Sequence, residues 1–552
     1  MTHHGQVVEA LMAALEAEYG DALVTAGGVS WLSVHHVPIR RLVTRVVRRL
    51  LDLNEAPAAT AFRATEDLVA ASGSTSLGYV AYEVSEAGLS FLLGHGGHGG
   101  HGGPGGPGGL APDRGEPGEP VQPRLKVTTA PVCAVSWSSR HAETLLPVLS
   151  ALAGQEVRST VVDMASEADQ RFPDTYEPGI TVLRLPDEAL DRHGDMPAQS
   201  AFRPENERTL RVGQHEIGIG RLAWLAARLL VRSASCTQPS WSATLYVEQW
   251  LDAVLLAFRS RVLLCSNDTS PLGVLAVRAA ERAAADTVYI QHGAWIEGQT
   301  SSHAQRCRHV AVMGARDVRV AQAGTWRADA RTYVVGQPRF DGLNQVDRLG
   351  QRAYLQRMLK EQTGAAPTKI VVWASQPFNE QRLLGQAEIL AEGLRNARGG
   401  WGLVVAPHPA QDAETLSPLL DVMNGVPVAL IGSEVGARGC LAGADALISL
   451  SSTCGIEALL LEVPVLELAL PATRTLGLAD YGAAWRCESS RDISRLLTRI
   501  DESPQTVRVP TAARESICRW DGRSAHAVAD IVTQALSGSA APHHSARGTD
   551  RR

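Results

Sequence analysis

Short apolar runs rich in Val, Ile and Leu alternate with helix-like segments, and this alternation occurs twice along the chain. In the first series, the strand-like runs include Arg261–Cys265, Thr287–Gln291 and His309–Met313. The second series starts at Lys369–Ala374 and continues to Val463–Leu468. Continuous apolar strands separated by helices are typical of parallel sheets covered on both faces. The pattern therefore predicts an α/β protein with two Rossmann-like, doubly wound parallel-sheet domains that face a cleft.

The chain is long enough for more than these two domains, because its 552 residues exceed the ~100–200 of a typical domain several times. The stretch Gly94–Gly109 reads GHGGHGGHGGPGGPGG and has no apolar side chain whose burial could offset the entropy of ordering it. We predict five segments: an N-terminal α/β appendage of unknown role (1–93), a flexible Gly/His/Pro-rich linker (94–124), an N-terminal Rossmann-like domain (125–340), a C-terminal Rossmann-like domain (341–536) and a disordered tail (537–552).

Charge and cysteine usage exclude several classes of function. The 52 Lys and Arg residues against 58 Asp and Glu give a net charge of −6, so a nucleic-acid partner is not expected. The eight cysteines are scattered without a CxxC pair, which indicates reduced thiols in a cytoplasmic protein and no metal site. No apolar run approaches a membrane span. Five arginines in Val37–Leu53 fit contact with anionic lipid at the inner face of a membrane or with an acidic partner, but a solvated helix face explains them more simply.

Ligands of doubly wound domains bind beyond the carboxyl ends of the strands, and three strand-terminal loops carry unusual residues. Gln291-His292-Gly293 and Pro407-His408-Pro409 each place an imidazole directly after a strand. Ser375-Gln376-Pro377 follows a third strand. A neutral imidazole can remove a hydroxyl proton, and a protonated one can stabilise a phosphate. His292 and His408 are therefore candidate catalytic residues, although each taken alone also fits a structural histidine.

A fourth loop, Ser451–Glu457, opens a helix, where hydroxyls and free backbone N–H groups suit a phosphate. Glu457 could accept hydrogen bonds from a ribose diol, and the alternative is that Ser452, Thr453 and Glu457 only cap the helix. Asp268 is either a site residue or the N-cap of the helix after Pro271. Arg339 lies at the expected crossover between the domains, where it either forms a local ion pair with Asp341 or contacts substrate.

The order of these motifs resembles the GT-B superfamily of glycosyltransferases. More narrowly, it resembles bacterial capsule and surface-polysaccharide transferases, namely the CDP-glycerol glycerophosphotransferases and the HP-motif sialyl- and Kdo-transferases. The resemblance extends over about Lys126–Leu536 and is carried by Gln291-His292-Gly293, Gly336-Gln337-Pro338-Arg339-Phe340-Asp341, Pro407-His408-Pro409, Ser451-Ser452-Thr453 and Glu457-Ala458.

This resemblance implies transfer of a sugar, or of glycerol phosphate, from a CMP-, CDP- or UDP-linked donor to a hydroxyl of a glycan, lipid-linked or small-molecule acceptor. The C-terminal domain would hold the donor and the N-terminal domain the acceptor, with no cofactor required. His292 would be the general base, and His408 with Ser451, Ser452 and Thr453 would contact the donor phosphate, while Glu457 would hold the ribose. Asp268, Gln291, Gly293, Arg339 and Gln376 are further substrate-binding candidates.

Two alternatives follow from the same motifs. Ser266-Asn267-Asp268-Thr269 resembles the GDT loop of the non-hydrolysing UDP-N-acetylglucosamine 2-epimerases, which have a comparable layout. In that family a Glu-Ala-Gly-Leu-Arg stretch follows the strand that here leads into His292-Gly293-Ala294-Trp295-Ile296, so this chain lacks the carboxylate and the arginine. The second alternative is a catalytically inactive GT-B scaffold that binds a nucleotide without turnover.

Overall fold

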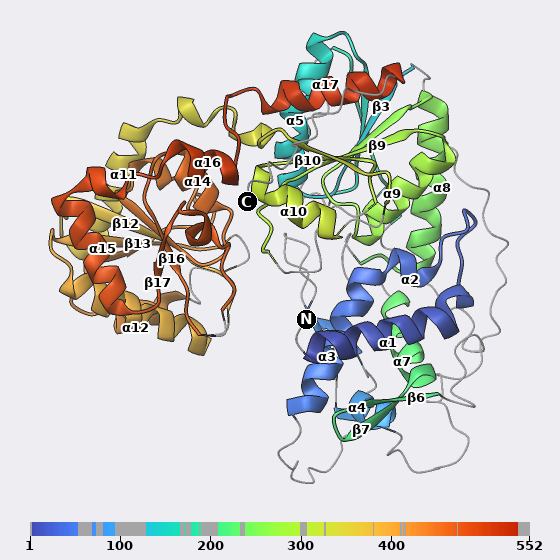
Figure 1. Cartoon of the computed structure of the whole chain (residues 1–552), viewed down its shortest axis with the longest axis horizontal. Coiled ribbons are helices and arrows are strands. Elements are labelled where there is room, and N and C mark those ends of the chain that lie inside the picture. The colour runs from blue at the N-terminus through green and yellow to red at the C-terminus, as the bar shows by residue number, and fades with distance from the viewer. Residues whose placement is uncertain are drawn as a thin grey trace, which may run out of the picture.

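A computed structural model describes residues 3–52, 69–72, 81–84, 86–93, 129–165, 172, 178–186, 189, 208–231, 238–297, 306–324, 327–378, 380–408, 411, 416–471 and 473–538. The linker predicted at 94–124 and the tail beyond residue 538 lie outside these described residues. Figure 1 shows two α/β units side by side and a third, largely helical unit next to the first of them.

A seven-stranded sheet forms the first α/β domain, with the strand order β11-β10-β9-β8-β3-β4-β5 and only parallel pairings. Its strands are β3 (Val132–Ser136), β4 (Ser159–Asp163), β5 (Ile180–Arg184), β8 (Val262–Cys265), β9 (Asp286–Ile290), β10 (His309–Val312) and β11 (Arg331–Val334). Alternate residues of β3 enter two different cores. Helices α8 (Trp241–Phe258) and α9 (Pro271–Arg282) cover one face, and α5 (Ser139–Gly154) and α17 (Ser524–Ser537) cover the other.

A six-stranded parallel sheet with the order β14-β13-β12-β15-β16-β17 forms the second domain. Its strands are β12 (Lys369–Ala374), β13 (Trp401–Ala406), β14 (Val428–Leu430), β15 (Ala446–Ser449), β16 (Val465–Leu468) and β17 (Trp485–Cys487). One face packs on α11 (Arg348–Thr363) and α14 (Cys454–Leu460), and the other on α12 (Glu380–Asn396) and α15 (Ser490–Glu502). The predicted fold class, two doubly wound parallel-sheet domains, is confirmed.

Helix α17 crosses from the second domain back to the first, where it lies along α5 (Figure 1). Its first two free amides, those of Ser524 and Ala525, donate to the two carboxylate oxygens of Asp341 at 3.0 and 2.9 Å. Asp341 therefore caps α17 and is not the local ion-pair partner of Arg339 that the sequence suggested. Asp521, which lies just before α17, pairs with Arg519.

The N-terminal appendage is a third unit with its own core. It contains α1 (His3–Tyr19), α2 (Trp31–Val34), α3 (His36–Asp52) and α4 (Glu86–Leu93), and the core is completed by β7 (His215–Gly218) and α7 (Ile219–Ala227). The last two segments fall inside the range 125–340 that we assigned to the first Rossmann-like domain. Two short antiparallel pairs, β1 (Val69–Ser72) with β2 (Ala81–Val84) and β6 (Thr209–Val212) with β7, accompany the helices.

Helix α3 buries its apolar face in this third core and exposes Arg41, Arg45, Arg48 and Arg49. This amphipathic division places the predicted arginine cluster on the solvent side of the unit. None of the helices that the structure describes is long and apolar enough to cross a membrane.

The segment that precedes η8 (Leu441–Gly443) is a series of turns. Gly436 has φ +55°, and a side chain at Gly439 would overlap Val435. Both features favour a tight loop over a helix. The loop matters because it carries Arg438 toward the first domain.

Candidate functional site

The strand order of each sheet reverses at one point, between β3 and β8 in the first domain and between β12 and β15 in the second. The loops that leave these strands meet across the domain boundary. Trp137 to His141 follow β3, and Ser266 follows β8. Gln376 follows β12, and Ser451 to Thr453 follow β15. This is where ligands bind in doubly wound folds, and it is where the sequence placed the site.

His292 lies just beyond β9 and is half-buried. Its Nδ1 is 2.5 Å from the backbone oxygen of Ser266. Because a carbonyl oxygen only accepts, Nδ1 must carry a proton, and in the neutral ring the lone pair is on Nε2. The His292 ring also meets His141 edge-on, with ring centroids 4.9 Å apart, and Trp137 packs against His141 in the same way at 4.6 Å. The position is therefore suited to a general base acting through Nε2.

Gln291 and Gly293, both candidates for substrate binding, flank His292. The Gln291 side chain is fully buried: its amide donates to Gly293 O and to Asp317, both at 3.1 Å, and its Oε1 accepts from Met313 N at 2.8 Å. With these bonds Gln291 holds the loop and does not face a substrate. A Cβ added at Gly293 would meet only the Thr453 hydroxyl, at 3.7 Å, so packing does not require glycine there.

His408 belongs to a connected group of polar residues at the ends of β12, β13 and β15. The backbone N–H of His408 donates to Gln411 Oε1 at 2.9 Å, and the Gln411 side-chain amide donates to the backbone oxygen of Gln376 at 2.9 Å. The Ser451 hydroxyl donates to Gln376 Oε1, also at 2.9 Å. The structure thus brings three predicted residues together. Since Ser451 uses its hydrogen on Gln376, the Gln376 Nε2 donor is the group this pair can offer to an anion.

Burial and the positive charge of Arg140 lower the pKa of His408 from 6.5 to about 4, so its imidazole is neutral at pH 7. As the pH falls below 6.5, His408 takes up a proton in the unfolded chain, whereas in the folded chain it does so only near pH 4. The free energy of unfolding therefore decreases as the pH falls from 6.5 towards 4. We predict that His408→Gln loses less stability in this window than the unmodified chain, by on the order of 1 kcal/mol at pH 4.5 given partial solvent exposure. Melting curves at pH 7.5 and 4.5 test this. Identical pH dependence of both proteins would contradict it.

Helix α14, which follows Ser451–Thr453, has only seven residues, and its Thr453 N-cap makes no side-chain cap bond. The Ser452 hydroxyl accepts from Cys454 N at 3.3 Å, and the Thr453 hydroxyl accepts from Ala294 N of the first domain at 3.2 Å. Each hydroxyl can still donate its own hydrogen. The loop therefore offers hydroxyl donors at the domain boundary, whereas the dipole of so short a helix adds little.

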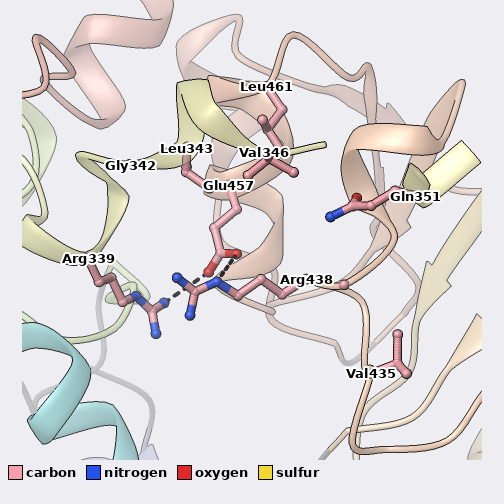
Figure 2. A pocket seen from close by; sticks show the side chains of 10 residues that line it. Arg339, Gly342, Leu343, Val346, Gln351, Val435, Arg438, Glu457 and Leu461 are labelled. Atoms are coloured by element: carbon pink, nitrogen blue, oxygen red, sulfur yellow. Dashed lines mark hydrogen bonds and ion pairs between the residues drawn. The ribbon is translucent and has the colours of Figure 1, made fainter. Parts of the chain in front are cut away.

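Glu457 is almost completely buried and pairs with two arginines (Figure 2). Its Oε1 accepts from Arg339 at 3.1 Å, and Oε2 is 3.5 Å from Arg438 Nε. Arg438 also pairs with Glu143 of α5 at 2.8 Å, which connects the two domains. Within the described residues Oε2 has no hydrogen bond. The local ion pair between Arg339 and Asp341 that the sequence suggested does not form, and Arg339 pairs with Glu457 instead.

Glu457, Arg339 and Arg438 line a pocket of about 470 Å³. Figure 2 shows the Glu457 carboxylate between the two guanidinium groups on one side and the Gln351 amide on the other. The Gln351 Oε1 accepts from Ala442 N at 2.8 Å, so its Nε2 is the group left for a ligand. The lining residues are Arg339, Gly342, Leu343, Val346, Gln351, Val435, Arg438, Gly439, Glu457 and Leu461. Such a mainly apolar pocket with a few polar groups is the usual form of a small-molecule site.

Asp268 is not the N-cap of α9, because Ser270 occupies that position. It is fully buried, and its Oδ2 accepts from the backbone amides of Arg306 and Cys307 at 2.7 and 2.9 Å. Its neighbour Asn267 forms the turn before α9 by accepting from Thr269 and Ser270. Asp268 therefore fastens the segment that enters β10.

Several residues at the site were missed from the sequence. Arg140 and His141 follow the first strand of the first domain, and the strand-end rule that found His292 would have found them too. Glu143, Arg438 and Gln351 carry no such signal, because only the packing of distant segments brings them together. No cluster of three or more His, Cys, Asp or Glu side chains that could hold a metal occurs in the described ranges.

No protein-family model and no curated protein matches the sequence. Several solved structures have a similar overall arrangement. A UDP-N-acetylglucosamine 2-epimerase homologue from Listeria monocytogenes has 14% identity and TM-score 0.49 over 75% of this chain and 99% of its own. A glycosyltransferase from Rickettsia africae has 8% identity and TM-score 0.46 over 75% and 100%. The wall teichoic acid polymerase TagF has 10% identity and TM-score 0.42 over 75% and 90%. At these identities and TM-scores we take nothing about activity from these proteins.

Proposed function

We propose that this chain is a transferase that moves a sugar, or glycerol phosphate, from a nucleotide-activated donor to an acceptor hydroxyl. The observation that carries the proposal is the buried Glu457 carboxylate in the 470 Å³ pocket, whose Oε2 has an ion pair with Arg438 at 3.5 Å but no hydrogen bond within the described residues. A buried carboxylate oxygen requires a donor. The vicinal hydroxyls of a ribose supply such donors, and the pocket is large enough for a nucleoside.

The donor phosphate would lie next to this pocket, along the loop that leads into α14. The Ser452 and Thr453 hydroxyls and the Gln376 amide are the donors available there. Arg140 would supply positive charge from the first domain, since its field already acts on His408 and Cys454. Charge that develops on the leaving phosphate would be stabilised by these groups and by an N–H of neutral His408.

His292 would act on the acceptor side. Nε2 takes the proton of the acceptor hydroxyl while the acceptor oxygen bonds to the donor carbon or phosphorus, and the bond from that atom to the nucleotide phosphate breaks. The electron pair of the broken bond leaves with the nucleotide. An epimerase-like use of Asp268 is not favoured, because its carboxylate is committed to the Arg306 and Cys307 amides. A role in capsule or surface-polysaccharide synthesis and contact with a membrane stay predictions.

Thermal denaturation with CMP, CDP, UDP and GDP tests the nucleotide proposal. We expect at least one of them to stabilise the chain, by about 2.7 kcal/mol at a concentration of 100 times Kd. The corresponding sugar or glycerol conjugates are then assayed for release of the nucleotide. Failure of every nucleotide to stabilise the chain would overturn the proposal. Binding without any release or transfer would instead indicate an inactive scaffold.

A further inference from the structure

The loop that carries His292 leaves the sheet of the first domain but packs in the core of the second. Ala294 and Ile296 contact the apolar cluster that α11 and α14 share with one face of the second sheet. In the middle of the loop, Ala294 N donates to the Thr453 hydroxyl at 3.2 Å. The loop is therefore held by both domains, although β9, the strand that precedes it, belongs to the first.

A second contact from the other domain holds the far end of the loop. Tyr481, in η9 (Leu478–Tyr481), donates its hydroxyl to Glu297 at 3.1 Å. Arg319 of α10 (Ala315–Gly324) donates to the same hydroxyl and lies 5.6 Å above the Tyr481 ring. Tyr481 thus joins the second domain to two elements of the first.

Buried polar groups of the first domain also hold the loop. Gln291 is bound to Asp317, and the Arg316 guanidinium donates to the backbone oxygen of Trp295. Arg316 and Asp317 are both almost inaccessible to solvent. With its base fixed in this way, the remaining freedom of the loop lies in the part that Thr453 and Tyr481 contact.

We propose that Thr453 and Tyr481 are positioning residues through which the second domain holds the loop of His292, in addition to the contacts that the His292 ring makes with Ser266 and His141 in the first domain. The inference rests on the proposed function of His292 as the base. The Thr453 hydroxyl accepts a hydrogen bond from Ala294 N in the loop, and its own hydrogen can be donated to a donor phosphate. One side chain therefore connects the donor site to the loop that carries His292. The base would then be fully positioned only while the second domain contacts its loop.

Hydrogen–deuterium exchange of the whole chain, followed in peptides that contain residues 291–297, tests the inference. Thr453→Val removes the acceptor at nearly constant volume, and Tyr481→Phe removes one hydroxyl. Each should speed exchange in these peptides roughly two- to tenfold, the factor for loss of one hydrogen bond. Thr453→Ser should restore the slow exchange. Unchanged exchange in both Thr453→Val and Tyr481→Phe would overturn the proposal.

Two matched variants control for nonspecific effects. Thr498→Val removes a similar acceptor, which binds Arg398 N at 3.1 Å on α15. Tyr354→Phe alters a ring that also carries an arginine above it, Arg357 at 5.5 Å. Neither should change exchange in 291–297. A general loss of folding would appear in the β12 peptides, and if Thr453→Val fails in this way, the partly exposed Tyr481→Phe carries the test alone.

Nucleotide and turnover measurements separate this inference from the proposed function. Tyr481→Phe should lower turnover of the donor found in the nucleotide screen about tenfold without changing the Kd of the nucleotide, because Tyr481 contacts the loop and not the pocket. Equal loss in affinity and turnover would contradict a positioning role. If no nucleotide binds but Thr453→Val and Tyr481→Phe still speed exchange in the loop, the proposed function is wrong. The inference that the second domain holds the loop is then still supported.

Discussion

Replacing His292 by glutamine is expected to lower transfer by a factor of about 10²–10⁴, the usual contribution of a positioned general base. Glutamine can still donate from its amide to Ser266 O, which His292 contacts at 2.5 Å, so the loop should keep its place. It has no basic nitrogen to take the acceptor proton. The measurement is the initial rate of transfer with the donor identified by nucleotide binding.

The matched control is His526→Gln, which changes an exposed histidine on α17. Its rate should equal that of the unmodified chain, and both variants should keep the melting temperature. If His292→Gln transfers at the full rate, another residue is the base and His292 leaves the mechanism.

Replacing Glu457 by glutamine is expected to lower both stability and nucleotide binding. The change removes the carboxylate from between Arg339 and Arg438, and leaving a buried charge unpaired costs about 3–5 kcal/mol. We expect about 3 kcal/mol, because Arg339 keeps Glu143 at 3.7 Å and Arg438 is 43% exposed. For a domain of this size the melting temperature should fall by about 6–12 °C.

The same variant should lose the stabilisation that nucleotides give, because the proposed ribose acceptor has lost its charge. Glu434→Gln is the control, since Glu434 is an exposed carboxylate in the loop that also carries Arg438. A Glu457→Gln protein with the original melting temperature would contradict the ion-pair account. An unchanged nucleotide response would remove Glu457 from the donor site.

The two sheets and the place of the site could be predicted because local patterns determine them. Continuous apolar strands need cover on both faces, and the ends of parallel strands lie at one edge of a sheet, so His292, His408 and Ser451–Thr453 could be assigned to that edge. The same rule applied to the loop after β3 would have added Arg140 and His141.

Contacts between distant segments could not be read in this way. The third core joins α1 and α3 with α7, more than 160 residues further along the chain, and no local pattern shows that pairing. The roles of Asp268, Arg339 and Asp341 also depended on distant partners, namely Arg306, Glu457 and Ser524. Charged residues beside turns are ambiguous in sequence because capping, ion pairing and substrate binding use the same side chains.

The central claim is that a nucleotide occupies the Glu457 pocket with its phosphate at the loop before α14. A crystal structure of the chain soaked with CDP or UDP, whichever stabilises it more, tests this most directly. We predict a ribose hydroxyl within hydrogen-bonding distance of Glu457 Oε2 and a phosphate oxygen beside the Ser452 and Thr453 hydroxyls. A nucleotide bound elsewhere, or one whose ribose does not contact Glu457, would contradict the account.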